Sequence, residues 1–191
     1  AVKKIYSLKK RPKINPLIIH YYSMKSLSKD AQLNKNFLKL YKNFCPGPLT
    51  FVLKKKNSSK VSSHATAKLD TIAVRFPKNS IIRNILKKIK FPLAIPSANK
   101  SAGISPVKAS HVVEEFGEQI KMILNGGDCK IGIESTVIDL SNKIRILRPG
   151  FVDISKITKI IKSKVLLKNN SNKIKAPGAL KKHYSPGIPM K

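Results

Sequence analysis

The chain has 191 residues, 41% of them hydrophobic, which is enough for one domain with a hydrophobic core. No run of residues approaches the roughly 20 apolar positions that a membrane helix needs, and no secretory signal precedes the globular pattern. Cys45 and Cys129 lie far apart, outside any metal-binding spacing, and are predicted to be free thiols in a reducing compartment. We therefore expect a cytoplasmic protein without a membrane segment.

The formal net charge is +30, from 39 Lys and Arg residues against 9 Asp and Glu residues, and it has two interpretations. A basic surface of this kind binds RNA phosphates with little sequence selectivity. However, 34 of the 39 cations are Lys and aromatic residues make up only 6%, whereas nucleic-acid sites favour the bidentate guanidinium of Arg. We attribute the charge mainly to an A-rich coding sequence and keep RNA contact as the alternative. The five arginines are then individually informative: Arg11, Arg75, Arg83, Arg145 and Arg148.

The first part of the chain predicts two helices and two strands. AVKKIYSLKK (1–10) and DAQLNKNFLKLYKNF (30–44) have helical spacing, and CPGP (45–48) ends the second helix. PLIIHYY (16–22) and LTFVLKK (49–55) have the composition of strands. These elements are long enough to begin a core.

A polar segment at 54–70 follows, and it is predicted to be a mobile loop; its length and polarity make gating of a site a hypothesis that the sequence does not decide. DTIAVRFP (70–77) then alternates like a strand. The residues 79–90 form an amphipathic helical pattern that begins with a capping Asn or Ser. FPLAIPSAN (91–99) reads as a buried strand that ends in small polar residues.

The sequence of Ser105 and Pro106 predicts a helix that starts there, with Ser as the N-cap and Pro as the first helical residue. ISKITKIIKSK (154–164) predicts a last short helix, and residues 141–143 a hairpin connection. The strands and turns between these helices are predicted at 122–128, 134–140 and 143–150.

Together these elements predict an α/β or α+β fold with a twisted, largely mixed sheet, because strands and helices alternate without a strict βαβ rhythm. We assign residues 1–167 to the folded domain. Residues 168–191 hold prolines and glycines without any helical or strand period and are predicted to form an extended tail.

Two clusters of polar residues are candidates for binding a phosphorylated ligand. Lys9 and Arg11 are separated by one residue, so an extended turn would point both cations the same way, a placement that needs an anion between them. Ser97 and Asn99 follow a strand, where small donors can approach a phosphate closely. Ser105 could add the helix dipole to the same anion, although ordinary N-capping is the commoner role of such a serine.

Other candidates are weaker when each is taken alone. The residues Glu134–Ser135–Thr136 lie behind glycines that permit a close approach of backbone, and Arg148 and Arg75 lie at the ends of predicted strands. His20 ends the strand that follows Asn15–Pro16, where a packed histidine is commoner than a ligand.

Jointly, the motifs SLKKRPKINPLIIH, CPGPLTFVLKK, TIAVRFP, PLAIPSANKSAGISP, GGDCKIGIESTVIDL and ILRPG, in this order, resemble the threonylcarbamoyl-adenylate synthase family with its YrdC-like fold. The resemblance covers roughly residues 5–184, and PGALKKHYSP is similar to the linker of the family's two-domain branch, which lies across the active site. Lys9 and Arg11 match the family's Lys-x-Arg element, and Ser97 and Asn99 its Ser-x-Asn element.

The resemblance implies an enzyme that condenses L-threonine, bicarbonate and ATP into threonylcarbamoyl-AMP and pyrophosphate, for modification of adenosine 37 in tRNA by downstream transferase proteins. It implies a catalytic set of Lys9, Arg11, Ser97 and Asn99, and a threonine set of His20, Arg75 and Ser135. The implied ATP-binding residues are Arg11, Asn15, Thr71, Ser97, Ser105, Arg148, His183 and Tyr184, with Mg²⁺ held by the phosphates and water instead of a carboxylate cage.

The family pattern also has a strand and a threonine-contacting segment before the first helix, and a second domain after the linker. Neither is present here, so we expect the chain to be truncated relative to the family. Cys45 stands where the family usually has Trp, which is expected to change packing more than chemistry.

Three alternatives stay open. The first is a YrdC-like module that binds tRNA or double-stranded RNA without chemistry, which predicts an affinity that falls steeply with salt. The second is a carbamoyl-transfer domain like that of hydrogenase-maturation proteins, and the third is an inactive truncated relic.

Overall fold

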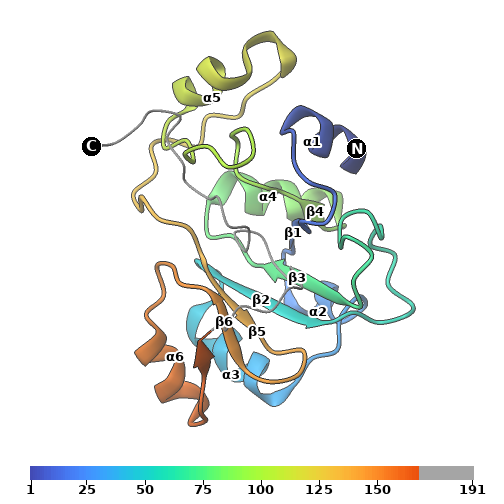
Figure 1. Ribbon diagram of the computed structural model, residues 1–191, viewed down its shortest axis with the longest axis vertical. Helices are drawn as coiled ribbons and strands as arrows, with labels where there is room; N and C mark the ends of the chain where they lie inside the picture. The colour runs from blue at the N-terminus through green and yellow to red at the C-terminus, as the bar shows by residue number, and fades with distance from the viewer. Residues whose placement is uncertain (168–191) are drawn as a thin grey trace.

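The computed structural model describes residues 1–167, and the predicted tail at 168–191 lies outside the described residues. The predicted fold class is confirmed: the domain is a mixed α/β structure built on one sheet (Figure 1). In the described part of the chain, no helix has both the length and the apolar character needed to cross a membrane.

The sheet has seven strands in the order β4-β1-β3-β2-β5-β6-β7. Its parallel pairs are β1 with β3, β2 with β5 and β6 with β7, and its antiparallel pairs are β1 with β4, β2 with β3 and β5 with β6. The strands β1, β3 and β6 therefore run in the same direction and end at the same edge. The bounds are β1 Ile18–His20, β2 Leu49–Lys54, β3 Thr71–Arg75, β4 Leu93–Ala94, β5 Thr136–Asp139, β6 Arg145–Arg148 and β7 Leu166–Leu167.

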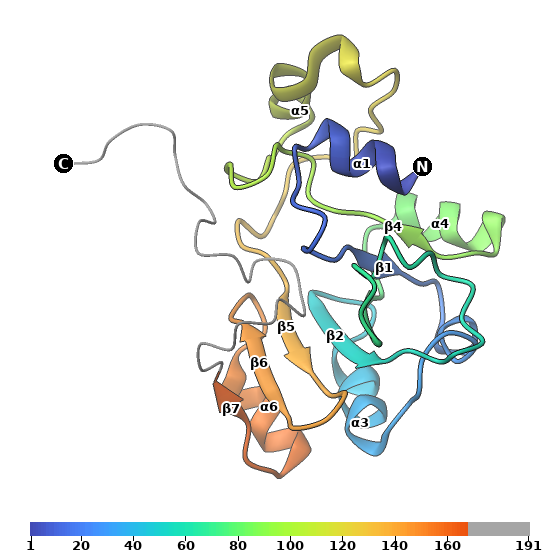
Figure 2. The ribbon, with the colours of Figure 1, turned by 45° about the vertical axis from the view of Figure 1, so that its right-hand side comes forward.

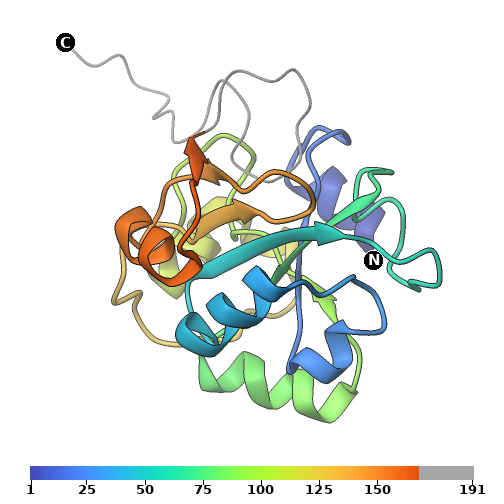
Figure 3. The same cartoon turned by 90° about the horizontal axis from the view of Figure 1, so that it is seen from below.

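The main core lies between the sheet and two helices, α3 (Lys35–Phe44) and α6 (Ile154–Ile161), which lie side by side (Figure 3). Phe37 of α3 packs edge-on against Phe51 of β2, with ring centroids 5.0 Å apart, and both rings are fully buried. The helix begins at Lys35, later than predicted, because the Asn34 side chain caps it by accepting a hydrogen bond from the Phe37 N–H at 2.9 Å.

The remaining helices are α1 (Val2–Leu8), α2 (Met24–Leu27), α4 (Ser80–Ile89), α5 (Ala109–Phe116) and the short 3₁₀ helix η1 (Gly117–Gln119). Figure 2 shows α1 and α5 at the end of the molecule away from α3 and α6. Asn79 caps α4 as predicted, accepting hydrogen bonds from Ile81 and Ile82.

The prediction that α5 starts at Ser105 is wrong. The helix begins at Ala109 after the N-cap Lys108, and the Ser105 hydroxyl instead donates to Glu134 Oε1 at 2.8 Å. A contact 29 residues away in the sequence has overridden the local capping signal. The strand predicted at 91–99 is also shorter than expected, since only Leu93–Ala94 pair with β1.

The segment at 54–70 was predicted to be mobile, but it is held to the core at several points. Ala65 and Thr66 are buried, and the Leu17 N–H donates to the Ala65 carbonyl at 2.8 Å. Asp30 accepts hydrogen bonds from the Ser59 hydroxyl at 2.7 Å and the Lys60 N–H at 3.2 Å. Because these contacts anchor the segment, they argue against its acting as a mobile gate.

Candidate functional site

A cleft with a volume of about 660 Å³ opens at the sheet edge where β1, β3 and β6 end. This volume is typical of small-molecule sites. Ten of the thirteen predicted site residues line it: Lys9, Arg11, Asn15, His20, Arg75, Ser97, Asn99, Ser105, Ser135 and Arg148. The strand directions therefore bring together residues that the sequence separates widely.

The structure does not bring Thr71 to this cleft. Thr71 begins β3, where it pairs with Lys54, whereas Arg75 ends the same strand and reaches the cleft. Thr71 is thus buried at the opposite edge of the sheet. The predicted nucleotide contacts of His183 and Tyr184 lie outside the described residues.

Lys9 lies in a turn that differs from the extended one predicted. Helix α1 ends at Leu8 with Lys9 as its C-cap, and Lys10 adopts a left-handed backbone conformation with φ of 47°. The Lys9 side chain is buried, and its Nζ donates to the carbonyl oxygens of Ser97, at 2.6 Å, and Asn99. Burial and repulsion from Arg11 lower the pKa of the Lys9 ammonium to about 8, and attraction to Glu134 opposes this shift.

Arg11 is held by the segment that leads into β1. Its Nε donates to the Asn15 carbonyl at 3.0 Å, and its Nη2 donates to Asn15 Oδ1 at 2.8 Å and the Pro16 carbonyl at 2.7 Å. The Tyr6 hydroxyl donates to the same Asn15 carbonyl at 3.0 Å. The guanidinium is therefore fixed before any ligand arrives.

His20 and Arg75 are cross-strand partners at the ends of β1 and β3. Burial, with a smaller effect from Arg75, lowers the pKa of His20 to about 3, so its imidazole is neutral at physiological pH. His20 Nδ1 lies 3.3 Å from the Ile18 carbonyl, which places the proton on Nδ1 and leaves Nε2 as an acceptor. The Arg75 Nε donates to the Gly47 carbonyl at 3.2 Å, and burial lowers the pKa of the Arg75 guanidinium.

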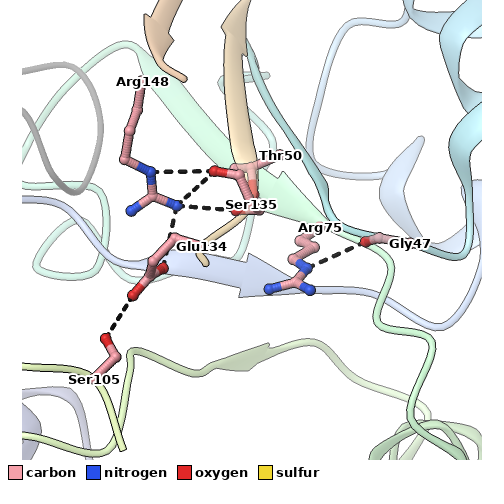
Figure 4. A network of polar contacts seen from close by, with 7 residues as sticks. All are labelled: Gly47, Thr50, Arg75, Ser105, Glu134, Ser135 and Arg148. Atoms are coloured by element: carbon pink, nitrogen blue, oxygen red, sulfur yellow. Dashed lines mark hydrogen bonds and ion pairs between the residues drawn. The ribbon is translucent and has the colours of Figure 1, made fainter. Parts of the chain in front are cut away.

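Figure 4 shows a connected network at the other side of the cleft. Arg148 donates from Nη2 to the Ser135 carbonyl at 2.8 Å and the Ser135 hydroxyl at 3.0 Å. Ser135 Oγ lies 2.8 Å from Thr50 Oγ1, within hydrogen-bond distance. Arg148 Nη2 also lies 3.3 Å from Glu134 Oε2, and Glu134 Oε1 accepts from the Ser105 hydroxyl.

Asn99 is buried, and its Nδ2 donates to the carbonyls of Lys100 and Gly103, each at 2.9 Å. These two bonds fix the orientation of the amide. Its Oδ1 is buried and has no hydrogen-bond partner among the described residues. Asn99 therefore offers an acceptor, whereas the sequence predicted a donor for phosphate.

The sequence singled out Glu134 only as part of the motif Glu134–Ser135–Thr136, and no role was predicted for its side chain. Among residues 1–167 it is the one acidic side chain in the lining of the cleft, which also contains six basic residues: Lys9, Arg11, Arg75, Lys100, Lys108 and Arg148. The chain has only nine acidic residues, so each of them, like each arginine, could have been treated as individually informative from the sequence.

The described residues contain no group of three or more His, Cys, Asp or Glu side chains that could hold a metal ion. The carboxylate of Glu134 is already engaged by Arg148 and Ser105. Its surroundings do not fit an all-protein Mg²⁺ cage.

A mixed sheet has a cationic cleft at one edge, and small hydroxyl and amide groups line this cleft, so its chemistry is suited to small anions. The family model for Sua5, YciO and YrdC proteins, described as telomere recombination, matches residues 1–150. The chain belongs to the Sua5/YciO/YrdC family, as its motifs predicted.

Two relatives are similar over nearly the whole chain. The threonylcarbamoyl-AMP synthase of Pyrococcus abyssi is 41% identical over 192 residues, which cover 97% of this chain and 56% of that protein. The threonylcarbamoyl-AMP synthase of Bacillus subtilis is 37% identical over an alignment of 196 residues, gaps included, which covers 100% of this chain and 56% of that protein. The chain thus spans about half the length of these curated relatives.

Solved structures agree with the fold. The crystal structure of P. abyssi Sua5 complexed with L-threonine matches with a TM-score of 0.90 at 39% identity, over 97% of this chain and 56% of that one. The crystal structure of Escherichia coli YciO matches with a TM-score of 0.72 at 22% identity, over 82% of this chain and 76% of that one, which supports the fold alone.

Proposed function

We propose that this chain catalyses the formation of threonylcarbamoyl-AMP and pyrophosphate from L-threonine, bicarbonate and ATP. The observation that carries the proposal is the convergence of Lys9, Arg11, Arg75 and Arg148 from three distant segments on one cleft. The names of the relatives and the threonine in the related crystal structure support it.

The reaction needs positioning and charge neutralisation more than covalent help from the protein. A carbamate formed on the threonine amine attacks the α-phosphate of ATP, and pyrophosphate leaves with the negative charge. Fixed guanidinium groups stabilise the charge that develops on the phosphate oxygens, because they do not have to reorganise. Arg11 and Arg148 are held in this way by carbonyl groups.

Arg75 is suited to the threonine carboxylate. Its Nε is bound to the Gly47 carbonyl, and Figure 4 shows its terminal nitrogens directed away from that carbonyl. A guanidinium with free N–H groups binds a carboxylate in a bidentate manner. His20 Nε2 and Asn99 Oδ1 supply the acceptors that the ammonium and hydroxyl groups of the amino acid need.

Several parts of the proposal rest on the family resemblance. Mg²⁺ would enter with the phosphates of ATP, tRNA and downstream transferase proteins would use the product, and the cytoplasm would be its location. The exposed residues Lys10, Lys13, Lys100 and Lys108 beside or near the cleft provide a basic surface suited to RNA phosphates.

The test is to incubate the purified chain with ATP, Mg²⁺, bicarbonate and L-threonine and to measure pyrophosphate release. We expect release that requires both threonine and bicarbonate and is lost in Arg11→Ala, with serine and no amino acid as controls. Release that is independent of threonine would contradict the proposal. Absence of release, with ATP still protecting the fold against heat, would mean that the chain retains a nucleotide site without the activity.

A further inference from the structure

The carboxylate of Glu134 stands among the cations of the cleft. It accepts a hydrogen bond from the Ser105 hydroxyl at 2.8 Å, and it lies 3.3 Å from Arg148 Nη2 (Figure 4). Its side chain is 23% exposed, so the charge is only partly screened by water. Attraction to Glu134 also raises the pKa values of Lys9, Arg11 and Arg75 against the lowering effect of burial.

The positions of these cations do not depend on Glu134. Lys9 is bound by the Ser97 and Asn99 carbonyls, and Arg75 by the Gly47 carbonyl. The Arg148 guanidinium is bound by the Ser135 carbonyl from both Nε and Nη2. Removal of the acid would therefore leave the basic groups where they are.

Glu134 itself is held close to them by its backbone. The Phe151 N–H donates to the Glu134 carbonyl at 3.1 Å. A Cβ on Gly150 would lie 2.5 Å from the same carbonyl oxygen, so the two segments are in direct backbone contact. The Glu134 carboxylate therefore already occupies two donors, Ser105 and Arg148, that a phosphate group entering the cleft would use.

We propose that Glu134 is an internal counter-anion, which offsets part of the positive charge of the cleft and competes with the phosphate groups of the ligand, so that pyrophosphate binds weakly and leaves readily. This inference rests on the proposed function only in that a phosphate-bearing ligand enters the cleft. It predicts the unusual result that removal of an active-site side chain tightens binding.

The experiment is isothermal titration of inorganic pyrophosphate, without Mg²⁺, into the wild-type chain and into Glu134→Gln. The amide keeps the size of the side chain and its acceptor for Ser105 but removes the like charge. We expect the dissociation constant of pyrophosphate to be about tenfold lower in Glu134→Gln than in the wild type. Repulsion between the carboxylate and the pyrophosphate should weaken binding to the wild type by at least about tenfold. Glu118→Gln makes the same charge change on the exposed helix η1, outside the cleft lining, and should change the constant by less than about twofold.

Unchanged or weaker binding in a folded Glu134→Gln would overturn the inference, as would equal tightening in Glu118→Gln, which would assign the effect to overall charge. Absence of pyrophosphate binding in the wild type would overturn it too. Glu134→Ala is the second variant if the amide variant does not fold. Failure of both to fold, even with pyrophosphate present, would make the acid structural and reject the inference.

The outcome is separable from the proposed function. One result would be that the wild-type chain binds pyrophosphate and yet forms no pyrophosphate from ATP in the presence of threonine. That result would reject the proposed activity, and the titrations would still decide the role of Glu134.

Discussion

Lys9 is the cleft cation whose charge changes in an accessible pH range. Its pKa is lowered from 10.5 to about 8, first by burial and then by repulsion from Arg11. Above this pH the folded chain loses the proton while the unfolded chain keeps it. The contribution of Lys9 to the free energy of unfolding therefore rises between about pH 8 and 10.5, whereas the positive charge available to a ligand falls.

We expect the affinity for ATP to fall by about tenfold as Lys9 loses its charge between about pH 7 and pH 9.5. Isothermal titration at several pH values measures this change. In Lys9→Arg the affinity should stay nearly constant over the same range, because Arg remains protonated. An equal fall in Lys9→Arg would show that another group titrates.

Ten of the thirteen candidate residues that the sequence motifs pointed to line one cleft, because cations and small donors in these motifs are local signals. Thr71 lies on β3, which reaches the cleft, but at the opposite end of that strand, and this placement depends on strand direction and pairing. No role was predicted for the Glu134 side chain, because its contacts with Ser105 and Arg148 join residues far apart in the sequence, and only the scarcity of acidic residues pointed to it.

At the scale of elements, the loop at 54–70 depends on Asp30 for its attachment. Asp30 accepts hydrogen bonds from the buried Tyr21 hydroxyl at 2.9 Å, as well as from Ser59 and Lys60. The loop in turn contacts the site indirectly, since the Tyr6 hydroxyl lies 3.2 Å from the His64 carbonyl and 3.0 Å from that of Asn15. A polar composition suggested mobility, but the anchoring acid lies outside the segment and could not be read from it.

Asp30→Ala is expected to lower the free energy of unfolding by about 3 kcal/mol, because it leaves the buried Tyr21 hydroxyl without its acceptor and frees the loop. Urea denaturation measures the loss, and limited trypsin digestion should cut faster after Lys60. Asp70→Ala, an exposed acid at the other end of the loop, serves as the control and should change little. A stable Asp30→Ala with unchanged digestion would mean that the loop is held by other contacts.

The turn after β6 depends on the absence of a side chain at Gly150. A Cβ there would lie 2.5 Å from backbone atoms of Glu134, Ser135 and Thr136, and backbone cannot move aside as a flexible side chain can. We expect Gly150→Ala to cost about 2 kcal/mol in urea denaturation and to weaken ATP binding through displacement of Ser135. Gly132→Ala, where no atom lies within 4 Å of the added Cβ, should be nearly neutral, and equal losses in the two variants would refute the steric argument.

The order of the longer elements was predictable from hydrophobic spacing and turn residues, whereas their ends were set by contacts. The short elements α2, η1 and β7 were not predicted, and no strand forms at 122–128. The helix after Ser105 starts late because the Ser105 hydroxyl is bound to Glu134. The strand predicted at 91–99 is short because only two of its residues meet β1. The ends of these elements depend on strand pairing and on contacts between distant residues, which cannot be deduced from a single sequence.

For the whole molecule, 9 acidic residues cannot neutralise 39 basic ones, so the fold forms against its own charge repulsion. Part of this repulsion is concentrated in the cleft, where six basic side chains face the single acid Glu134. The surface component should respond to any salt, because the Debye length is about 10 Å at 0.1 M. The cleft component should respond to an anion that binds there.

These two components can be separated by melting temperature. Raising NaCl from about 10 mM to about 300 mM should raise the melting temperature by several degrees, because screening reduces repulsion between exposed lysines. At constant ionic strength, pyrophosphate should raise it further, because a ligand that binds the folded state stabilises it by mass action. Arg11→Ala should keep the NaCl response and lose most of the pyrophosphate response. If the variant keeps both responses, the anion binds to the surface and not in the cleft; if NaCl has no effect on either protein, the excess of lysine does not limit stability.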